Sequence, residues 1–565
     1  MKKIFYIILA MALVFSSCEK QPVNQNQGNG NGNNNTENPG GSTTPTEPET
    51  NWTYYYAGNF AFDLMDTYYL WKKEIKAQML VWENNIAVDP IAKIANIRYK
   101  DLDDSRYDDK WTQAIDDYQT FMGEVTGITT TYGYDFNGFA QDKENTNRVL
   151  ATIRYVYANS PAADAGLKRG DVIVQVNGKD IPIIWQGTSG YVDSDFIYDQ
   201  MVYSSNCTLT LKDGRTVSMT AREMVEDPVI MYRVIENDKG QKIGYLHYTS
   251  FTAESCYSLI EACQYFKSEG IKELVLDLRY NGGGAVVAEE VLISMLAPRA
   301  NVEAEDIFEK EVYNSDYAAQ MIKWYGPEAN ISRFSFHHDF IFGGKHYQFN
   351  TENANIGLEK IYAIVTDDSA SASEALICCL KPFMPVVLIG QQTYGKYCGG
   401  YIIGSDEYFQ DIKDTYNDPD VQKEYSLSAD DIAEANTFAN NGLKYASNWG
   451  LYVMYSSYSD RDGVTLCKPD GIKPDYTAMD NPQDGFQLGD PNETMLKSTL
   501  KRAGFTVTES SNAQQQAPAR YDTGVEIKFQ RREKPGMVRE LTSLPGHRRD
   551  PQIPLLSNDR YTRAE

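Results

Sequence analysis

Strands that run into helices dominate the second half of the chain, and this alternation restricts the fold more than any other feature. Ile243–Tyr248 is predicted to be a strand, Glu254–Glu269 a helix, and Glu273–Leu278 a buried strand. Short strands alternating with helices are typical of an α/β unit. We therefore expect an α/β domain over residues 236–504, interrupted by an acidic insertion at 405–445.

Two turns rich in small residues enter helices of this domain. The first is Arg279–Gly284, and the second is Ser369–Glu374, which follows the strand Ile361–Val365. Unpaired amides at a helix N-terminus stabilise negative charge, which suits either a phosphate or a reaction oxyanion. The first turn has neither a Walker lysine nor a GxGxxG pattern, so the oxyanion is favoured. A serine with small neighbours in the second turn is a candidate nucleophile.

A serine hydroxyl needs a base before it can attack near neutral pH. Lys396 lies in a Gly-Lys turn soon after the apolar strand Pro385–Ile389, and burial in such a place favours a neutral lysine. His247, in a predicted strand, is the alternative base. The residues alone leave this choice open.

The first part of the chain differs from the α/β domain in its periodicity. Aromatic and aliphatic residues at helical spacing, such as Phe60, Leu64 and Tyr68, predict a small helical unit over 52–124. Residues 125–230 have short strands and an Asp-Gly hairpin turn, which indicates a β-rich module. With 565 residues the chain is long enough for three or four units, and we expect a multidomain α/β and α+β architecture.

The stretch Asn159–Ile173, followed by Val176-Asn177-Gly178, resembles the motif S-P-A-x-x-A-G-L-x-x-G-D-x-I-x-x-V-N-G of bacterial PDZ domains. The resemblance implies a domain that binds a peptide carboxylate on a glycine loop by adding the peptide to a sheet edge. Tyr132-Gly133-Tyr134 is the candidate loop. The alternative is a PDZ domain that serves only as a spacer.

Leu276–Gly284, Ser369–Glu374 and Thr393–Lys396 together resemble the C-terminal processing peptidases, or tail-specific proteases. The resemblance implies a catalytic domain of the crotonase/ClpP-like type behind the PDZ domain. It also implies that Ser371 is the nucleophile and Lys396 the base, 25 residues apart (396 − 371).

The same resemblance assigns the oxyanion hole to the backbone amides of Gly283 and Ala372. Many relatives have a glutamine four residues after the lysine, which orients it, but this chain has Gly400 there. The third catalytic member is therefore open. Glu374 could assist, although Ser371-x-x-Glu374 is also a capping box and needs no catalytic role.

The two ends of the chain read as segments outside the folded part. Residues 1–17 are predicted to be a signal peptide, and Cys18 after Ser16-Ser17 resembles a lipobox cysteine, which implies lipidation. An Asn- and Gly-rich tether follows to residue 51, and 505–565 is predicted to be disordered. We expect a protein anchored by lipid to a membrane of the bacterial cell envelope, on the periplasmic or outer surface. An ordinary signal peptide is the alternative.

Several ligand classes have little support. With Lys plus Arg at 53 and Asp plus Glu at 78, the net charge of −25 disfavours nucleic acid. No CxxC or HExxH occurs, and we expect no metal and no organic cofactor. His337-His338-Asp339 is interpreted as a surface strand. Calcium at Asp414, Asp418 and Asp420 is disfavoured because their spacing matches no EF-hand.

We predict a serine endopeptidase whose PDZ domain captures proteins with apolar C-termini and whose Ser–Lys dyad cuts them. The alternative is a catalytically inactive envelope lipoprotein that binds peptides with the same fold. A third hypothesis, a glycan-binding protein, depends only on the 40 tyrosines and 7 tryptophans.

Overall fold

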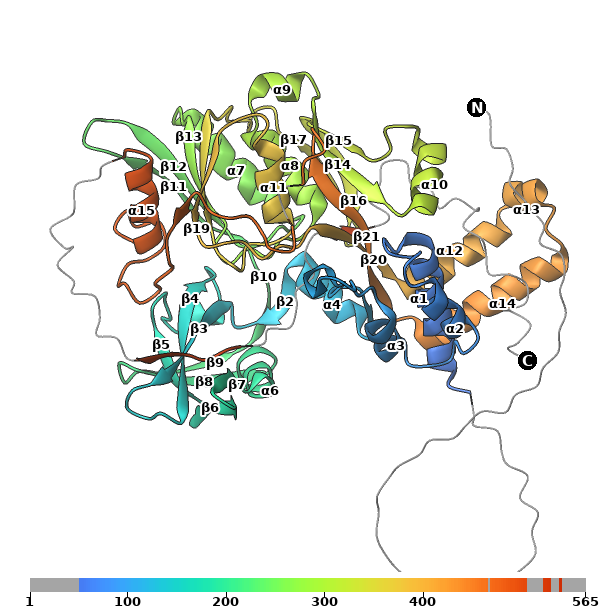
Figure 1. Ribbon diagram of the computed structural model, residues 1–565, viewed down its shortest axis with the longest axis horizontal. Helices are drawn as coiled ribbons and strands as arrows, with labels where there is room; N and C mark the ends of the chain where they lie inside the picture. The colour runs from blue at the N-terminus through green and yellow to red at the C-terminus, as the bar shows by residue number, and fades with distance from the viewer. Residues whose placement is uncertain (1–49, 466–467, 506–521, 530–537, 541–565) are drawn as a thin grey trace, which may run out of the picture. The chain divides into compact units, whose positions relative to one another are not determined.

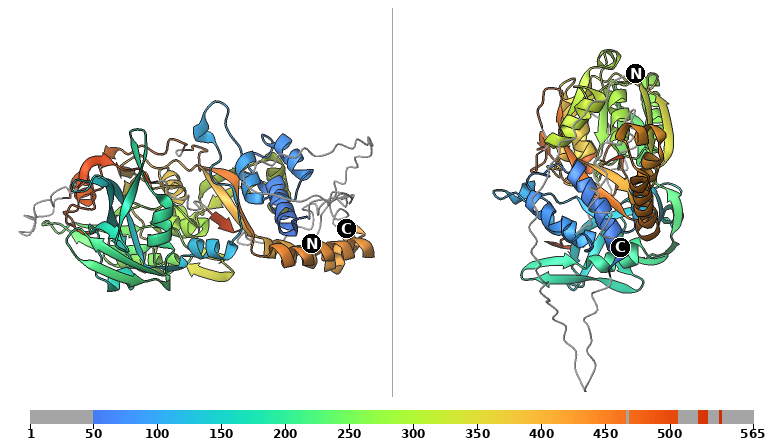
Figure 2. Two further views of the ribbon diagram at one scale, coloured as in Figure 1. Left: turned by 90° about the horizontal axis from the view of Figure 1, so that it is seen from below. Right: turned by 90° about the vertical axis from the view of Figure 1, so that its right-hand side faces the viewer.

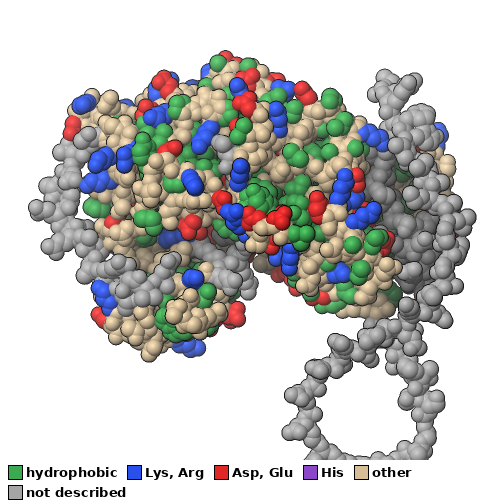
Figure 3. Space-filling model, viewed as in Figure 1, with side chains coloured by type: hydrophobic (Ala, Val, Ile, Leu, Met, Phe, Trp, Pro, Cys, Tyr) green, Lys and Arg blue, Asp and Glu red, His purple; other side chains and the backbone are tan. Residues whose placement is uncertain are grey.

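The computed structural model describes residues 50–465, 468–505, 522–529 and 538–540 (Figure 1). The predicted signal peptide, Cys18 and the tether lie outside these residues. No helix within the described ranges is long and apolar enough to cross a membrane. Figure 3 shows one face of the molecule, on which acidic and basic side chains are interspersed.

The α/β domain is built on a largely parallel sheet. Its strand order is β11-β12-β13-β18-β19-β22, with only β11 antiparallel to its neighbour. The strands are β11 (Val229–Glu236), β12 (Lys242–Tyr248), β13 (Glu273–Asp277), β18 (Lys360–Val365), β19 (Val386–Gly390) and β22 (Tyr476–Thr477). The strands predicted around residues 243–248, 273–278, 361–365 and 385–389 are all present.

Helices cover both faces of this sheet, as continuous apolar strands require. Leu246, Leu276 and Ala363 point into one core with α7 (Ser255–Ser268), α8 (Val286–Leu296) and α11 (Ala372–Leu380). The alternate residues, including Tyr245 and Ile364, pack on the other face against α15 (Thr494–Arg502).

A second sheet lies across α8 and α11. Its order is β15-β14-β21-β20-β24, and β1 also pairs with β21. The strands are β1 (Gln113–Ile115), β14 (Ile307–Tyr313), β15 (Ile331–Arg333), β20 (Cys398–Gly404), β21 (Gly450–Asp460) and β24 (Val538–Glu540). Ile402, Tyr452 and Met454 share the core of α8 and α11, so these helices are enclosed between two sheets.

The N-terminal helices and the insertion form one core on the outer face of this second sheet. The helices are α1 (Trp52–Tyr68), α2 (Lys76–Glu83), α3 (Pro90–Ile97), α12 (Ser405–Asn417), α13 (Pro419–Tyr425) and α14 (Ala429–Ala446), whereas α4 (Tyr118–Thr126) packs in the main core. Tyr56 and Phe438 lie 5.4 Å apart between ring centroids, and Phe60 and Tyr408 5.3 Å apart. The orange insertion lies beside the blue helices in Figure 2.

The insertion holds three helices, and the predicted N-terminal helical unit shares its core with them. The physical reason is burial: short helices with an aromatic stripe cannot bury it by themselves and need a partner surface.

The β-rich module has the predicted strands. Its sheet has the order β23-β3-β4-β6-β5-β8-β9, with β7 beside β6. The strands are β3 (Tyr134–Asp142), β4 (Arg148–Val156), β5 (Val172–Val176), β6 (Lys179–Gln186), β7 (Ser189–Val192), β8 (Asn206–Leu211), β9 (Thr216–Thr220) and β23 (Asp522–Glu526), with α5 (Pro161–Asp164), α6 (Ser194–Ile197) and the π-helical η2 (Tyr198–Val202). Asp213-Gly214 makes the turn between β8 and β9, with Gly214 at φ +90°.

The remaining elements lie at the edges. They are η1 (Ser105–Tyr107), β2 (Ile128–Thr131), β10 (Arg222–Val225), α9 (Arg299–Glu303), α10 (Ser315–Tyr325), β16 (His337–Phe342) and β17 (Lys345–Asn350). The expected surface strand at His337–Asp339 is therefore part of β16.

The stretch 505–565, expected to be disordered, contains two short strands, β23 and β24. Each pairs with the edge of a sheet that is already formed, β3 or β20. Such pairing needs only a few residues and leaves no periodic pattern, which is why the sequence did not indicate it.

Candidate active site

Ser371 stands at the sharp turn between β18 and α11. It is the N-cap of α11, it is fully buried, and its backbone has φ 58° and ψ −113°. Such a conformation costs a residue with a β-carbon about 1–3 kcal/mol. The strain places the side chain at the mouth of the helix, where the sequence predicted a nucleophile.

The Glu374 carboxylate joins this turn to the turn of Lys396. Its Oε2 accepts hydrogen bonds from the backbone N–H of Ser371 at 2.8 Å and of Lys396 at 3.0 Å. Its Oε1 accepts from Thr393 Oγ1 at 2.5 Å and from the Gly395 N–H at 2.9 Å. The capping box is present, and the same carboxylate also fixes the lysine turn. Glu374 therefore contacts the backbone of both dyad candidates.

A tyrosine adds a second link between the two turns. The Tyr458 hydroxyl lies 3.3 Å from the Ser371 carbonyl oxygen and 3.2 Å from the Lys396 carbonyl oxygen. The structure therefore brings together the predicted nucleophile and the predicted base, which are 25 residues apart in sequence.

The Lys396 side chain is enclosed by aromatic groups. Lys396 is 2% exposed, and its Nζ donates a hydrogen bond to the Tyr452 hydroxyl at 2.9 Å. Nζ also lies 5.2 Å from the ring centroid of Trp111 and 5.0 Å from that of Tyr452. Cation–π attraction and the hydroxyl both hold the amine in place.

Tyr452 fills the space left by the missing glutamine. A Cβ at Gly400 would overlap the Tyr452 ring, lying 2.6 Å from Cζ, so the ring and a side chain at 400 exclude each other. The Tyr452 hydroxyl therefore contacts the lysine from the place that a residue at position 400 would occupy. This removes the main reason for expecting an inactive protein.

The two predicted oxyanion residues lie side by side. Gly283 has φ +98°, and a Cβ on it would lie 2.9 Å from Ser371 Cβ and 3.0 Å from the Ala372 nitrogen, so only glycine fits. Ala372 is the first residue of α11. The Gly283 N–H donates to Asn281 Oδ1 at 2.9 Å. The Gly283 N–H has to break or share its hydrogen bond to Asn281 before it can donate to an oxyanion.

His247, the alternative base, packs elsewhere. Its ring lies between Tyr155 and Tyr280, at centroid distances of 6.0 and 6.1 Å. Burial lowers the pKa of His247 to about 4. A histidine with this pKa is a weak base near neutral pH, which favours Lys396.

The candidate PDZ loop immediately precedes β3. Gly133 has φ +73°, and a Cβ on it would lie 2.9 Å from Oγ of Ser160, a residue of the PDZ motif. Its N–H donates to Thr131 Oγ1 at 3.1 Å, and the Tyr132 carbonyl accepts from the Ala162 N–H. Tyr134 is the first residue of β3. The loop is thus anchored to the motif, and it leads into β3, which pairs with β4 on one side and with β23 on the other.

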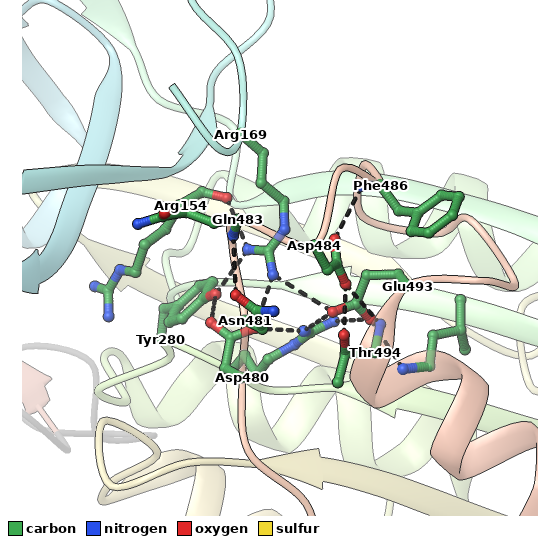
Figure 4. Close-up of polar contacts among 12 residues, drawn as sticks. Arg154, Arg169, Tyr280, Asp480, Asn481, Gln483, Asp484, Phe486, Glu493 and Thr494 are labelled. Carbon is green, nitrogen blue, oxygen red and sulfur yellow. Dashed lines mark hydrogen bonds and ion pairs between the residues drawn. The ribbon is translucent and has the colours of Figure 1, made fainter. Parts of the chain in front are cut away.

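A buried ion network connects this module to the α/β domain (Figure 4). Arg169 of the PDZ motif donates to the Tyr280 hydroxyl at 2.8 Å and to Asp480 at 2.7 Å. Arg279 binds Asp480 at 3.0 Å and Glu493 at 2.7 Å. Tyr280 lies one residue before Asn281, so the network touches the turn that carries Gly283.

A second arginine reaches the nucleophile turn itself. Arg154 of β4 pairs with Asp135 of β3 and with Asp368, and its guanidinium lies 4.0 Å from the Tyr280 ring centroid. Asp368 is three residues before Ser371. A strand of the β-rich module is thereby held directly on the turn of the candidate nucleophile.

The remaining candidate ligands have ordinary partners. Asp418 caps α13, and Asp414 accepts from Gln410 on the same helix. Within the described part of the chain, no group of three or more His, Cys, Asp or Glu is arranged to hold a metal ion.

Comparison with known proteins identifies both modules. Residues 242–402 match the model of peptidase family S41, and residues 152–193 match a PDZ domain model. The carboxy-terminal processing protease CtpA of Bacillus subtilis is 23% identical over 288 residues, covering 50% of this chain and 53% of that protein. Carboxyl-terminal-processing peptidase 1 of Arabidopsis thaliana chloroplasts is 26% identical over 272 residues, covering 46% and 48%. The chain thus spans about half the length of these relatives.

A solved structure shares the fold. The putative S41 protease from Bacteroides fragilis has a TM-score of 0.54 and 20% identity, covering 79% of this chain and 97% of that one. The predicted PDZ module and peptidase family are confirmed. The chain therefore carries a PDZ domain followed by a domain of peptidase family S41, and it is related to the carboxyl-terminal processing peptidases.

Proposed function

We propose that this chain is a serine endopeptidase that cleaves proteins with a Ser371–Lys396 dyad. The observation that carries the proposal is the Glu374 carboxylate, which binds the backbone N–H of both residues and so fixes their turns against each other. The adjacency of the two turns and the resemblance of their motifs to the C-terminal processing peptidases support this pair.

The reaction begins with neutral Lys396, which removes the proton from Ser371 Oγ while Oγ attacks the scissile carbonyl carbon. Ala372 N–H and the glycine turn stabilise the negative charge on the carbonyl oxygen. The lysine returns its proton to the leaving amine, which releases the C-terminal product and leaves an acyl-enzyme on Ser371. Water, deprotonated by Lys396, then hydrolyses the ester and restores the serine.

The proposal also covers the substrates, the type of catalytic fold and the membrane anchor. The substrates are proteins with apolar C-terminal tails, bound by the PDZ domain through strand addition. The catalytic domain is of the crotonase/ClpP-like type. The mature protein is anchored to the cell envelope by lipid on Cys18, and incorporation of a labelled fatty acid into wild type but not Cys18→Ser would support this anchor.

The test is turnover of an unstructured protein with an apolar C-terminus by the full chain. Ser371→Ala and Lys396→Ala should each lower turnover by about 10³-fold or more. The exposed pair Ser447→Ala and Lys444→Ala provides matched controls that should leave turnover unchanged. If both dyad variants stay within about tenfold of wild type, the dyad is refuted.

A further inference from the structure

The C-terminal part of the chain occupies the edge of the PDZ sheet. β23 pairs antiparallel with β3, and the pairing continues where the Ile527 N–H donates to the Phe139 carbonyl at 3.1 Å. Lys528 bonds in both directions with β7, through Gly190 and Val192 at 2.9 Å each. These contacts lie along β3 at residues 139–142, on the strand that follows the candidate loop, and strand addition is the way in which PDZ domains bind peptides.

Apolar side chains of this segment are anchored in the module. Ile527 is 2% exposed and belongs to the core of the PDZ domain. The ring of Phe529 lies 4.8 Å from that of Phe139 and 6.1 Å from that of Tyr198 at the start of η2. The segment therefore presents an Ile-x-Phe pair to the module, as a bound ligand would.

The next described segment, β24, lies beside the catalytic turns. It pairs in parallel with β20, whose first residue is two positions after Lys396, and Val538 is opposite Gly400. The Val538 N–H donates to the Gly284 carbonyl at 2.8 Å. Gly284 adjoins Gly283, which touches Ser371. An extended peptide thus lies between the glycine turn and the strand that follows the base.

The side chains of β24 fill specific places. Val538 is 1% exposed and packs in the main core, and Arg539 is 6% exposed. Arg539 pairs with Glu290 of α8 at 3.1 Å, and its Nε lies 3.3 Å from the Tyr455 hydroxyl. Glu290 and Arg539 border a cavity of about 400 Å³ that is also lined by Glu311. At this place an apolar residue is therefore buried in the core, and the arginine that follows it is paired with a carboxylate.

We propose that the C-terminal segment is a built-in peptide ligand, which occupies the PDZ edge through Ile527 and Phe529 and a subsite beside Ser371 through Val538 and Arg539. An external protein has to displace it, and substrates with an apolar residue followed by arginine use the same subsite. The inference deepens the proposed function and rests on it. Full burial of Ser371 agrees with a site that its own chain closes.

Chain length adds a constraint on the substrates. Phe529 and Val538 are nine positions apart, and nine residues of extended chain span at most about 30 Å. One substrate tail of similar length can therefore reach both surfaces at once. Such tethered binding gives effective concentrations in the millimolar range.

Binding of a synthetic peptide with the sequence of residues 522–550 tests the subsite without catalysis. The receptor is the full chain with Ser371→Ala and Arg539→Glu, so that its own segment is displaced, and the readout is fluorescence anisotropy. The native peptide should bind at least about tenfold more tightly than a peptide carrying Arg539→Glu, because a charge-assisted bond is lost. A peptide carrying Arg548→Glu is the charge-matched control and should bind like the native one.

A charge reversal makes the test specific. A second receptor carries Ser371→Ala and Glu290→Lys but keeps its own Arg539, so that like charges keep its own segment displaced, and its preference should turn toward the Arg539→Glu peptide. Equal affinity for the two peptides in the unreversed receptor, or no binding of the native peptide, overturns the proposal. Since the receptor lacks Ser371, these outcomes do not depend on whether the dyad is catalytic, which the Ser371→Ala turnover experiment decides separately.

Kinetics of the active chain supply the second readout. If the segment competes with an intrinsic Kd of about 100 μM at an effective concentration of about 1 mM, it raises the apparent KM about tenfold. Arg539→Glu should therefore lower KM for an external substrate about tenfold with kcat unchanged, whereas Arg548→Glu should change neither. An unchanged KM, or a fall in kcat and Tm alone, means that the segment is only structural and overturns the proposal.

Discussion

The hydrogen bond from Lys396 to Tyr452 gives the sharpest test of the catalytic geometry. Tyr452→Phe removes the hydroxyl that accepts from Nζ at 2.9 Å but keeps the ring that fills the space beside Gly400. Packing and the cation–π contact at 5.0 Å are therefore retained. What changes is the hydrogen bond between the amine and the Tyr452 hydroxyl.

The size of the effect follows from the positive charge that Lys396 acquires as it takes the proton from Ser371. A hydrogen bond to a charged group contributes about 1.5–3 kcal/mol. If the same contact positions the lysine in the transition state, its loss lowers kcat/KM by about 10- to 150-fold, at 1.36 kcal/mol per factor of ten. The hydroxyl oxygen also stabilises the ammonium form, so its removal moves the acid limb of the kcat/KM profile to lower pH.

The assay is kcat/KM for a fluorogenic peptide across pH 5–10. Tyr401→Phe is the matched control, because it removes another buried tyrosine hydroxyl, one that bonds to Tyr317 at 2.8 Å and not to the lysine. We expect a lower plateau and a shifted acid limb only for Tyr452→Phe. A plateau within threefold of wild type, with an unshifted limb, would refute the reasoning.

Position 400 supplies a complementary pair of variants. Gly400→Gln alone should impair folding, since its Cβ would overlap the Tyr452 ring. Combining it with Tyr452→Ala removes the ring, and the flexible end of Met454, whose Cε lies 2.5 Å from the same Cβ, can then move aside, so part of the activity should recover because the glutamine can reach the lysine. Failure of the double variant to exceed Gly400→Gln would mean that the two side chains are not alternatives.

Three further outcomes are expected. Four donors bind the Glu374 carboxylate, and the amide of Glu374→Gln can accept from only two of them, so this variant should lose about 2–6 kcal/mol of unfolding free energy. It should also slow the labelling of Ser371 by a serine-directed reagent. Unchanged labelling would contradict the bridging role of Glu374. His247 has a folded pKa of about 4, below its ordinary 6.5, so its contribution to the free energy of unfolding is complete above pH 6.5 and is lost as pH falls to 4. In urea titrations, His247→Phe should lack about 3 kcal/mol of this fall in stability, and its activity at pH 8 should persist. If the variant loses as much stability as wild type at low pH, the assignment to His247 is wrong. Burial raises the pKa of Asp480, but the charges of Arg169 and Arg279 outweigh it and hold the pKa well below its ordinary value, so the stabilisation is present above about pH 4 and is lost at lower pH. Asp480→Asn should cost about 3–5 kcal/mol at pH 7 and flatten that acid loss in unfolding curves, and a cost below 1 kcal/mol would show that the network is dispensable.

The sequence could predict those parts of the site that local motifs encode. Ser371 and Lys396 each follow an apolar strand in a recognisable turn, and parallel strands bring such turns to one edge of a sheet. The β-strands of the PDZ domain were equally readable, because alternation and an Asp-Gly turn are local signals.

Residues that reach the site through long-range pairing could not be found in this way. Tyr452 arrives on β21, whose antiparallel register with β20 is set by packing and leaves no local trace. Trp111 comes from the N-terminal unit, more than 280 positions before Lys396, and its indole looked like any core aromatic. The available signal was Gly400: because a glycine stands where the glutamine was expected, a residue from elsewhere in the chain has to contact the lysine.

The strained backbone of Ser371 makes the reactive serine a liability for the folded state. Glycine tolerates positive φ without the steric cost, so a chain with glycine at 371 would be inert yet better folded. Under the proposed function, Ser371→Gly would remove the nucleophile and relax the turn in a single mutational step. For a receptor that is meant to hold intact proteins, glycine rather than alanine is the replacement that relaxes the turn, and the benefit of the proposed proteolysis has to outweigh the cost of the strained serine.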